Sequence, residues 1–144
     1  MDDIEALAAA VIRLARHLEL ARRETLAARE LEVWEYDVLL ALRTTDAKAG
    51  LSPGALVGAT QVASGTMTNR IDRLARRGLV TREPDPGDRR GVLVRLTPTG
   101  RRRVDQARGD VRKAEARMFD ALGSRKRQQL NAATAEALGV FEGA

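Results

Sequence analysis

The sequence predicts a mainly α-helical chain that carries one small β-hairpin, and three observations lead to this prediction. Much of the 44% hydrophobic share is Ala and only 3% of the residues are aromatic, a composition that favours helices. Apolar residues recur three and four positions apart along several segments, which is the repeat of an α-helix. Residues 92–96 instead alternate apolar side chains, as a strand does, and they follow a dense cluster of turn-forming residues.

The first part of the chain is expected to contain three helices. Residues 3–27 carry an apolar seam of the heptad type, and residues 31–44 form a second helix. After a polar linker over residues 47–50, a short third helix over residues 52–60 begins with Ser, a good N-cap, and Pro, which suits the first turn. The seam of the first helix consists of Ile4, Leu7, Val11, Leu14 and Leu18.

Three further helices are expected later in the chain. A tight turn over residues 61–63 leads into a helix over residues 64–77, which ends at Gly78. A long helix follows over residues 98–121, and a last helix over residues 125–140. The long helix has a seam of Val104, Ala107, Val111, Ala114 and Met118, and the last one carries Leu130, Thr134, Leu138 and Phe141.

A hairpin separates the fourth helix from the fifth. Residues 79–82 are expected to form a short strand that pairs with the returning strand over residues 92–96. The segment between them, residues 83–88, is rich in Pro, Asp and Gly. This composition predicts a long loop with a basic tip at Arg89 and Arg90.

The order of these elements indicates a winged helix-turn-helix, since two helices joined by a tight turn are followed by a β-hairpin. We therefore expect a DNA-binding lobe over residues 31–97. The flanking segments, residues 1–30 and 98–144, are longer than so small a lobe needs, and their apolar seams require a partner. A second copy of the chain is the simplest partner, so we expect these segments to be the dimerisation helices of a homodimer.

The charge of the chain is concentrated in its middle third. The whole sequence has a net charge of +5, but residues 61–103 carry 11 Arg and Lys against 4 Asp and Glu, a local net charge of +7. Residues 1–60 have a net charge of −3 and residues 104–144 a net charge of +1. A concentrated basic region is typical of binding to a polyanion such as double-stranded DNA, and its alternative is a solvated basic face.

The fourth helix is the candidate for recognition of DNA, because the second helix of a helix-turn-helix enters the major groove with its N-terminal residues at the base edges. Met67, Ile71 and Leu74 are expected to face inward, which leaves hydroxyl, Asn and Arg side chains outside. Hydroxyls suit phosphates or bases, Asn suits adenine, and Arg suits guanine or phosphate. The candidate DNA-binding residues are Ser64, Gly65, Thr66, Thr68, Asn69, Arg70 and Arg73.

The hairpin supplies a second candidate contact with DNA. Arg89 and Arg90 are expected to extend from its tip, and Arg is favoured in a narrow minor groove by the negative potential there. Asp88 is an unusual neighbour for DNA unless it orients an arginine, so we expect it to pair with Arg73 or Arg90. The alternative is a surface salt bridge with little effect on stability.

Several other classes of site are disfavoured by composition. The chain has no Cys and only one His, His17, so thiolate or histidine metal sites and a cysteine nucleophile are not expected, and no cofactor is implied. There is no glycine-rich phosphate loop, so we do not expect an enzyme. No apolar run is long enough to span a membrane and the N-terminus lacks the pattern of a signal peptide, so we expect a cytoplasmic protein.

Seven stretches with matched spacing, between about residues 31 and 103, together resemble the MarR family of bacterial regulators. The most specific of them is the run PDPGDRR at residues 84–90, which precedes a Val- and Leu-rich strand. One departure is that Ala55 and Thr60 stand where the family usually has Glu and Leu. The seven stretches are residues 36–42, 51–54, 64–68, 71–74, 77–80, 84–90 and 92–100.

The resemblance implies a triangular homodimer that is held by its first and last helices and binds pseudo-palindromic sites near promoters, usually as a repressor. By motif position it implies that Asp88 and Arg90 form a wing pair, with Arg90 at the minor groove. It also implies that a small aromatic or anionic effector binds between the dimer helices and the DNA-binding lobe and releases DNA.

Residues for such an effector pocket are suggested by side-chain chemistry. Arg13, Arg16 and His17 on the first helix are candidates to pair with a carboxylate, and Trp34 on the second helix is a candidate to stack on a ring. The alternatives are that Trp34 belongs to the core or an interface and that His17 is a surface residue.

Two other functions remain open at this point. A winged-helix module that binds a protein is one, although a protein interface would favour aromatic side chains over the hydroxyls of the fourth helix. A non-specific architectural DNA binder is the other. Sequence preference distinguishes it from a regulator, which should favour its site over random DNA by about 10³-fold or more.

Overall fold

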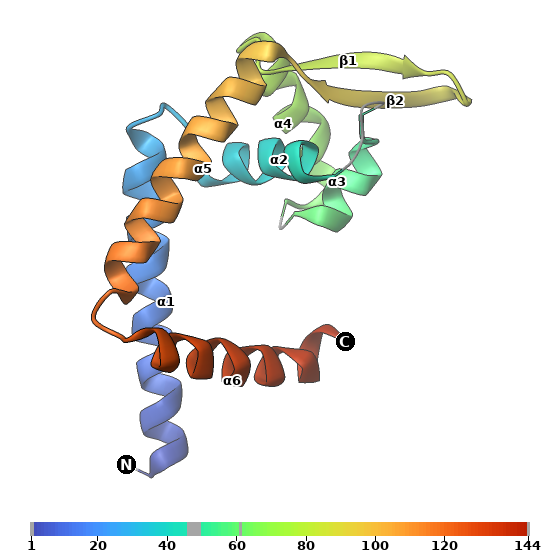
Figure 1. The fold of residues 1–144 in the computed structure, drawn as a ribbon. Coiled ribbons are helices and arrows are strands. Elements are labelled where there is room, and N and C mark those ends of the chain that lie inside the picture. The colour runs from blue at the N-terminus through green and yellow to red at the C-terminus, as the bar shows by residue number, and fades with distance from the viewer. Residues whose placement is uncertain (1, 46–49, 61, 144) are drawn as a thin grey trace.

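The computed structural model describes residues 2–45, 50–60 and 62–143, which form a mainly helical chain with one antiparallel hairpin (Figure 1). The predicted fold class is therefore confirmed. The predicted linker over residues 47–50 and the turn over residues 61–63 lie partly outside the described residues. The elements are α1 (Asp3–Ala27), α2 (Val33–Thr44), α3 (Pro53–Ala59), α4 (Ser64–Arg76), β1 (Val80–Asp85), β2 (Asp88–Leu96), α5 (Pro98–Phe119) and α6 (Ser124–Glu142).

Local sequence signals set the ends of these helices. The Ser52 hydroxyl accepts a bond from the backbone N–H of Ala55 at 3.1 Å, and the Thr97 hydroxyl accepts one from Gly100 at 2.9 Å. Each hydroxyl thereby satisfies a backbone donor that has no partner within its helix. Gly78 follows α4 with a φ of 72°, a left-handed conformation that glycine adopts without steric cost.

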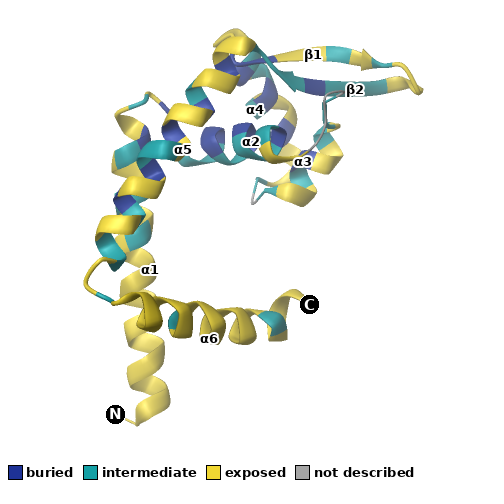
Figure 2. Ribbon diagram, in the orientation of Figure 1, coloured by how far each residue is buried: buried dark blue, intermediate teal, exposed yellow. Residues whose placement is uncertain are grey.

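One hydrophobic core lies between α2, α3, α4, the hairpin, the C-terminal end of α1 and the N-terminal two-thirds of α5 (Figure 2). It therefore joins the DNA-binding lobe to parts of both flanking segments, so the lobe does not fold around residues 31–97 alone. The largest side chains buried in this core are Leu26, Leu39, Leu56, Met67, Ile71, Leu74 and Leu79.

The apolar seam of α5 finds its partners within the chain. Val104, Ala107 and Val111 are at most 3% exposed, because α5 runs alongside α1 and also packs against α2. The expectation that this seam requires a second copy of the chain is therefore wrong for most of its length. Only the far end of α5, where Met118 is half-buried, leaves the core.

The two strands form an antiparallel ribbon that projects from the lobe (Figure 1). Val80 pairs with Leu96 and Pro84 with Val92, and Leu51 adds a short bridge to Val94 through backbone bonds of 3.0 and 2.8 Å. This bridge anchors the base of the ribbon to the segment just before α3.

The prediction of a long loop at the tip of the hairpin is wrong. Pairing continues to Asp85 and Asp88, which leaves a turn of only two residues, Pro86 and Gly87. Proline is tolerated in such a two-stranded ribbon because both strands are edges. The register shifts after Pro84, so residues 89–91 bulge from β2 and the predicted basic residues lie on a strand rather than in a loop.

The two ends of the chain leave large apolar side chains uncovered. The N-terminal half of α1 extends beyond α5, and α6 turns away from both long helices, with every residue of α6 at least partly exposed (Figures 1 and 2). Across the described residues, no helix is both long and apolar enough to cross a membrane. The apolar residues that are more than half exposed are Ile4, Leu7, Val11, Ile12, Leu138, Val140 and Phe141.

Candidate nucleic-acid interface

Helix α4 presents one face to the core and the opposite face outward. Met67, Ile71 and Leu74 are buried as predicted. At about 100° per residue, the side of the helix opposite to them carries Asn69 and Arg76, and both are exposed. The predicted contact residues at the N-terminal end of α4 are all exposed: Ser64, Gly65, Thr66, Thr68 and Asn69.

The N-terminus of α4 is chemically suited to an anion. Its N-cap residue is Ala63, which has no side-chain oxygen to accept bonds from the first N–H groups of the helix. The Thr66 hydroxyl bonds to the Ala63 carbonyl at 3.0 Å. The positive end of the helix dipole and donors without a side-chain cap favour a phosphate or another acceptor at this position.

The predicted arginines of α4 extend toward the start of α2, beside Asn69. Arg70, Arg73 and Arg77, spaced three and four residues apart, form a line along the helix that faces the N-terminus of α2; we call it the arginine stripe. Arg73 is exposed, as predicted for the outward polar face, and lies one turn along the helix from Asn69, whereas Arg70 is half-buried at the edge of that face. Both side chains contact Trp34 at the start of α2, and Arg73 also contacts Glu32.

The first two residues of the arginine stripe contact the start of α2 through Trp34 and Glu32. The guanidinium carbon of Arg70 lies 4.4 Å from the centre of the Trp34 ring, and that of Arg73 lies 5.3 Å from it. Glu32 Oε2 accepts a bond from Trp34 Nε1 at 2.8 Å and lies 3.5 Å from Arg73 Nη2. Cation–π stacking and an ion pair therefore connect the recognition helix to α2.

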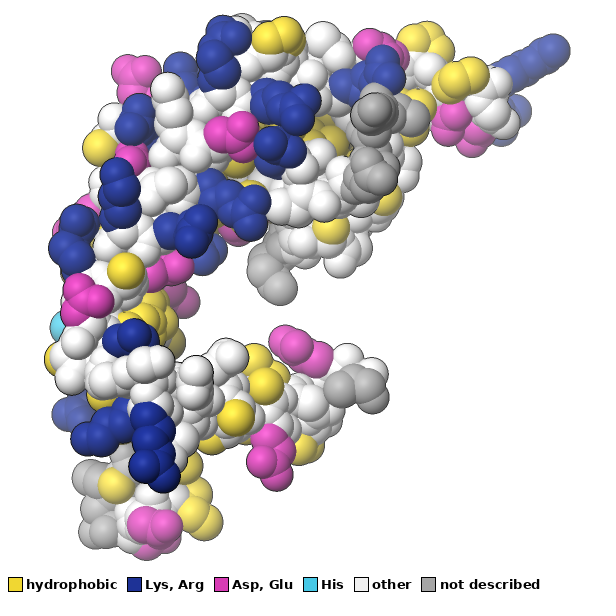
Figure 3. Space-filling model, in the orientation of Figure 1, with side chains coloured by type: hydrophobic (Ala, Val, Ile, Leu, Met, Phe, Trp, Pro, Cys, Tyr) yellow, Lys and Arg dark blue, Asp and Glu magenta, His cyan; other side chains and the backbone are white. Residues whose placement is uncertain are grey.

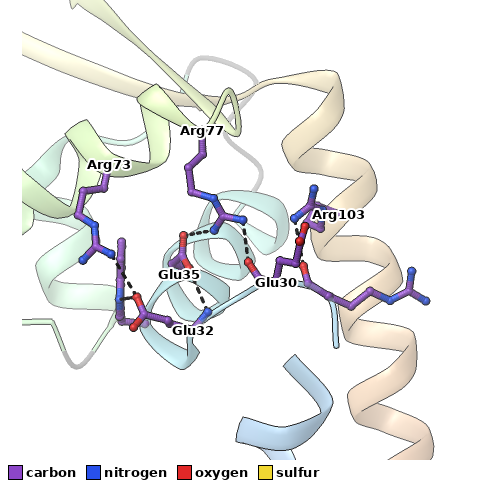
Figure 4. Close-up of polar contacts among 8 residues, drawn as sticks. Glu30, Glu32, Glu35, Arg73, Arg77 and Arg103 are labelled. Atoms are coloured by element: carbon purple, nitrogen blue, oxygen red, sulfur yellow. Dashed lines mark hydrogen bonds and ion pairs between the residues drawn. The ribbon is translucent and has the colours of Figure 1, made fainter. Parts of the chain in front are cut away.

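Arg77 makes the most buried of these contacts. It forms an ion pair with Glu35, which is only 4% exposed, and donates a bond of 2.7 Å to the Glu30 carbonyl (Figure 4). Glu30 joins α1 to α2 in a left-handed conformation with a φ of 57°. Arg103 of α5 donates to the neighbouring Arg29 carbonyl at 3.0 Å, so arginines from two helices fix this corner.

The other side of α4 faces the hairpin. Asp72 forms an ion pair with Arg82 of β1, which ties the recognition helix to the wing. A groove of about 300 Å³ lies between the start of α3, α4 and the hairpin, and both Thr68 and Arg90 line it. The fold therefore brings together one predicted helix residue, Thr68, and two predicted wing residues, Asp88 and Arg90.

The wing residues are exposed at the end of the ribbon. Arg89 and Arg90 lie in the bulge of β2, and basic side chains project from the tip in Figure 3. The Asp88 carboxylate accepts a bond from the backbone N–H of Arg90 at 3.0 Å. Asp88 thus shapes the bulge through the backbone, and the expected pairing with Arg73 is wrong because Arg73 lies against Glu32.

A cavity of about 690 Å³ opens between α1 and the start of α2, on the side of the lobe away from the wing. Of the predicted effector residues, only Trp34 lines it. Arg13, Arg16 and His17 lie on the exposed part of α1, beyond the edge of the cavity, because this helix leaves the lobe at a point nearer its C-terminus.

The charged groups of this cavity come from later turns of α1 and from α2 and α5. Arg22 and Arg23 take the place expected for Arg13 and Arg16, and the carboxylates of Glu19, Glu32 and Glu115 are also in the lining. The cavity therefore offers both cations and anions beside an aromatic ring. This lining suits a ligand that combines a ring with polar groups better than a purely anionic one.

Arg22, which lines this cavity, connects α1 to α2 and α5. Its guanidinium lies 3.3 Å from Glu115 and 3.8 Å from Asp37, and its carbon is 5.9 Å from the centre of the Tyr36 ring. Burial raises the pKa of the Asp37 carboxyl, and the charge of Arg22 opposes part of that increase. Burial likewise raises the pKa of the Tyr36 hydroxyl.

Several polar residues of the interface were not among the predicted ones, and Arg76, Glu32 and Arg82 illustrate why. Arg76 shares the outward face of α4 with Asn69, and its spacing from the buried positions would have revealed this. Glu32 and Arg82 act by holding Arg73 and Asp72, and these contacts join residues far apart in the sequence or on separate elements. Local periodicity carries no signal for such pairs.

Comparison with known proteins places this geometry in a family. The sequence profile of the MarR family matches residues 29–91. The transcriptional regulator PecS of Dickeya dadantii is 39% identical over 71 residues, which cover 49% of this chain and 43% of PecS. An uncharacterised HTH-type transcriptional regulator of Mycobacterium leprae is 36% identical over 102 residues, or 71% of this chain and 66% of that protein.

The structural match is longer than these sequence matches. A mutant of MarR from Escherichia coli, solved in complex with operator DNA, superimposes with a TM-score of 0.80 and 26% identity, covering 94% of this chain and 96% of that one. The sequence matches to PecS and to MarR of Salmonella typhimurium span about half the length of these curated relatives. PecS and the Mycobacterium leprae protein are transcription regulators rather than enzymes. The chain belongs to the MarR family.

Proposed function

We propose that this chain is a sequence-specific DNA-binding transcriptional regulator that acts as a homodimer on a pseudo-palindromic operator. The observation that carries the proposal is the groove shared by α4 and the wing, in which Thr68 and Arg90 meet beside an exposed helix N-terminus. A helix with polar N-terminal residues suits the major groove, and an arginine on a projecting ribbon suits the adjacent minor groove. The solved complex of the related MarR mutant with operator DNA supports this arrangement.

The base and phosphate contacts are divided by their positions on α4. Base edges and nearby phosphates are contacted by Asn69 and by the exposed residues at the helix start, Ser64, Gly65, Thr66 and Thr68. Arg70 and Arg73, which stack on Trp34, contact the phosphates beside the groove. At the wing, Arg89 and Arg90 contact the backbone and the minor groove, and Asp88 shapes their bulge.

The homodimer is supported by the uncovered apolar side chains at the two ends of the chain. Leu7 is 65% exposed and Phe141 84% exposed, and neighbouring positions on α1 and α6 are similar. An uncovered apolar surface of this kind marks an interaction site. Two-fold symmetry then gives two half-sites about one helical turn apart, roughly 10 bp from centre to centre.

The regulator acts as a repressor that a small ligand releases. The cavity between α1 and α2 supports this part of the proposal, because it lies between a dimerisation helix and the DNA-binding lobe. Trp34 offers a ring for stacking, and Arg22 and Arg23 offer cations for an anionic group.

The experiment that tests the function is selection of binding sites from randomised duplex DNA with the purified protein at a stated salt concentration, because affinity depends on salt. We expect enrichment of an inverted repeat with half-sites about one turn apart. Enrichment of duplexes without a common sequence would favour the architectural binder instead. Adding candidate aromatic compounds to the selected complex then tests release.

A further inference from the structure

The arginine stripe rests on a platform that the sequence gives no sign of. We propose that Trp34, fixed by Glu32, is a positioning residue that holds Arg70 and Arg73 in place for contact with DNA phosphates. The inference rests on the proposed function, since it concerns how that interface is prepared before DNA arrives. Its evidence is the stacking of Arg70 and Arg73 over the Trp34 ring, at 4.4 and 5.3 Å.

Stacking on a ring leaves the donors of an arginine available. A planar guanidinium that stacks its face on a ring keeps its N–H groups pointing outward within its own plane. These are the donors that bind phosphate oxygens in pairs. The Trp34 ring can therefore restrict the rotamers of Arg70 and Arg73 without itself accepting their hydrogen bonds. The Glu32 carboxylate, 3.5 Å from Arg73 Nη2, faces one side of the Arg73 guanidinium and leaves its other donors for phosphate.

The ring itself is fixed in two steps. Trp34 Nε1 donates to Glu32 Oε2 at 2.8 Å, which sets the direction of the indole. The backbone N–H of Glu32 donates to the carboxylate of Glu35 at 3.0 Å, as part of the capping box of α2 (Figure 4). Because Glu35 is buried and ion-paired with Arg77, the platform is anchored in the core of the lobe.

The position of the arginine stripe indicates phosphate contacts rather than base contacts. Arg70 lies about 100° around α4 from Asn69, and Arg73 lies one turn further from the helix N-terminus that meets the bases, so both arginines are expected at the walls of the groove and not at its floor. Phosphate contacts carry no sequence information. Loss of the platform should therefore weaken binding to all duplexes by the same factor.

The test compares duplex binding by the wild type, Trp34→Ala and Trp34→Phe, on the selected operator and on a scrambled duplex of equal length. We expect Trp34→Ala to weaken binding to both duplexes by roughly fivefold, the scale of two exposed cation–π contacts. Trp34→Phe keeps an aromatic face and should stay within about twofold of the wild type.

A second background separates positioning from a general effect on the fold. When Arg70→Ala and Arg73→Ala are already present, Trp34→Ala should cause less than about a twofold further loss, because the groups it positions are gone. An equal loss in both backgrounds, or no loss in the wild type, would overturn the proposal. Arg102→Ala, which removes an exposed charge from α5, is the matched background that should leave the fivefold effect intact.

A third measurement needs no tryptophan variant, because Trp34 is the single Trp of the chain. Arg70 covers one face of the ring, so Arg70→Ala should increase quenching of the fluorescence by acrylamide. Unchanged quenching would contradict the stacked geometry.

The binding measurements also separate this inference from the proposed function. If the wild type binds the operator no better than the scrambled duplex, the proposal of a sequence-specific regulator fails, while the effect of Trp34 can still be measured on both duplexes. If the wild type binds neither duplex, both proposals fail.

Discussion

Glu35 is the only buried charged residue among the described residues, and its environment explains why it is tolerated there. Its carboxylate accepts the backbone N–H of Glu32 at 3.0 Å and forms an ion pair with Arg77. A buried charge is costly unless it is paired and hydrogen-bonded, and both conditions are met. The pair also holds α4 against the start of α2.

Removing Arg77 should therefore destabilise the folded protein, although Arg77 is not one of the proposed DNA contacts. Arg77→Ala leaves the Glu35 carboxylate buried without its cation, and we expect the free energy of unfolding to fall by about 1–3 kcal/mol. Urea denaturation monitored by circular dichroism measures this change. Arg76→Ala, at an exposed position of the same helix, should change the value by less than about 0.5 kcal/mol, and similar losses for both variants would contradict the account.

At the same scale, Asn69 is the residue expected to read a base. It lies on the outward face of α4, where the N-terminal part of a recognition helix meets the bases. Asn69→Ala should weaken operator binding by about 1–3 kcal/mol and relax preference at one position of each half-site. Binding titrations with operators substituted at single positions check this, and an equal loss on scrambled duplex would exclude a base contact.

Among the elements, the helices were predictable from sequence and the wing was not predictable in detail. Periodic apolar residues and caps such as Ser52 and Thr97 located the helices within a few residues of their observed ends. The tight wing turn differs from the predicted long loop because an exposed ribbon accommodates proline: Pro84 is paired with Val92, and Pro86 lies in the two-residue turn. The partners of Arg70 and Arg73 were missed because Trp34 and Glu32 lie on another helix, far away in sequence.

The start of α5 illustrates a close approach between elements that a composition analysis does not reveal. A Cβ atom at Gly100 would lie 1.9 Å from the Leu79 carbonyl oxygen, so only glycine lets the first turn of α5 pack against the backbone that precedes β1. This contact fixes the direction in which α5 leaves the wing. The helix then continues alongside α1.

Gly100→Ala should therefore destabilise the protein, although alanine favours helices in general. We expect the free energy of unfolding to fall by about 1–3 kcal/mol, because the backbone of Leu79 must move. Gly109 lies in the same helix with open space around its Cβ position, so Gly109→Ala should instead raise stability by up to about 1 kcal/mol. Thermal unfolding of the two variants gives the comparison, and a Gly100→Ala protein as stable as Gly109→Ala would refute the packing argument.

For the whole molecule, one hydrophobic core holds the lobe while the chain ends carry unpartnered apolar side chains. The core extends from Leu26 to Val111, but Leu7 on α1 and Phe141 on α6 lie outside it. The sequence indicated a need for a partner at both flanking segments. It could not indicate that the α5 seam is satisfied within the chain, because a seam looks the same whichever helix covers it.

Dimerisation should accordingly depend on the exposed part of α1. Leu7→Glu places a charge on the apolar seam where the single chain leaves it 65% exposed, so the lobe should fold normally while the dimer is weakened at least about tenfold. Ala9→Glu puts the same charge on the opposite face of α1 and is the control. Sedimentation equilibrium reports both, and a Leu7→Glu protein that associates as the control does would place the interface elsewhere.

The most direct test of the central claim is the ratio of the affinities of the wild-type protein for its selected inverted repeat and for a scrambled duplex, measured by competition at one fixed salt concentration. A sequence-specific dimeric regulator should prefer the repeat by about 10³-fold or more, and bind it with two chains per site. A ratio near one, or one chain per site at saturation, would contradict the claim.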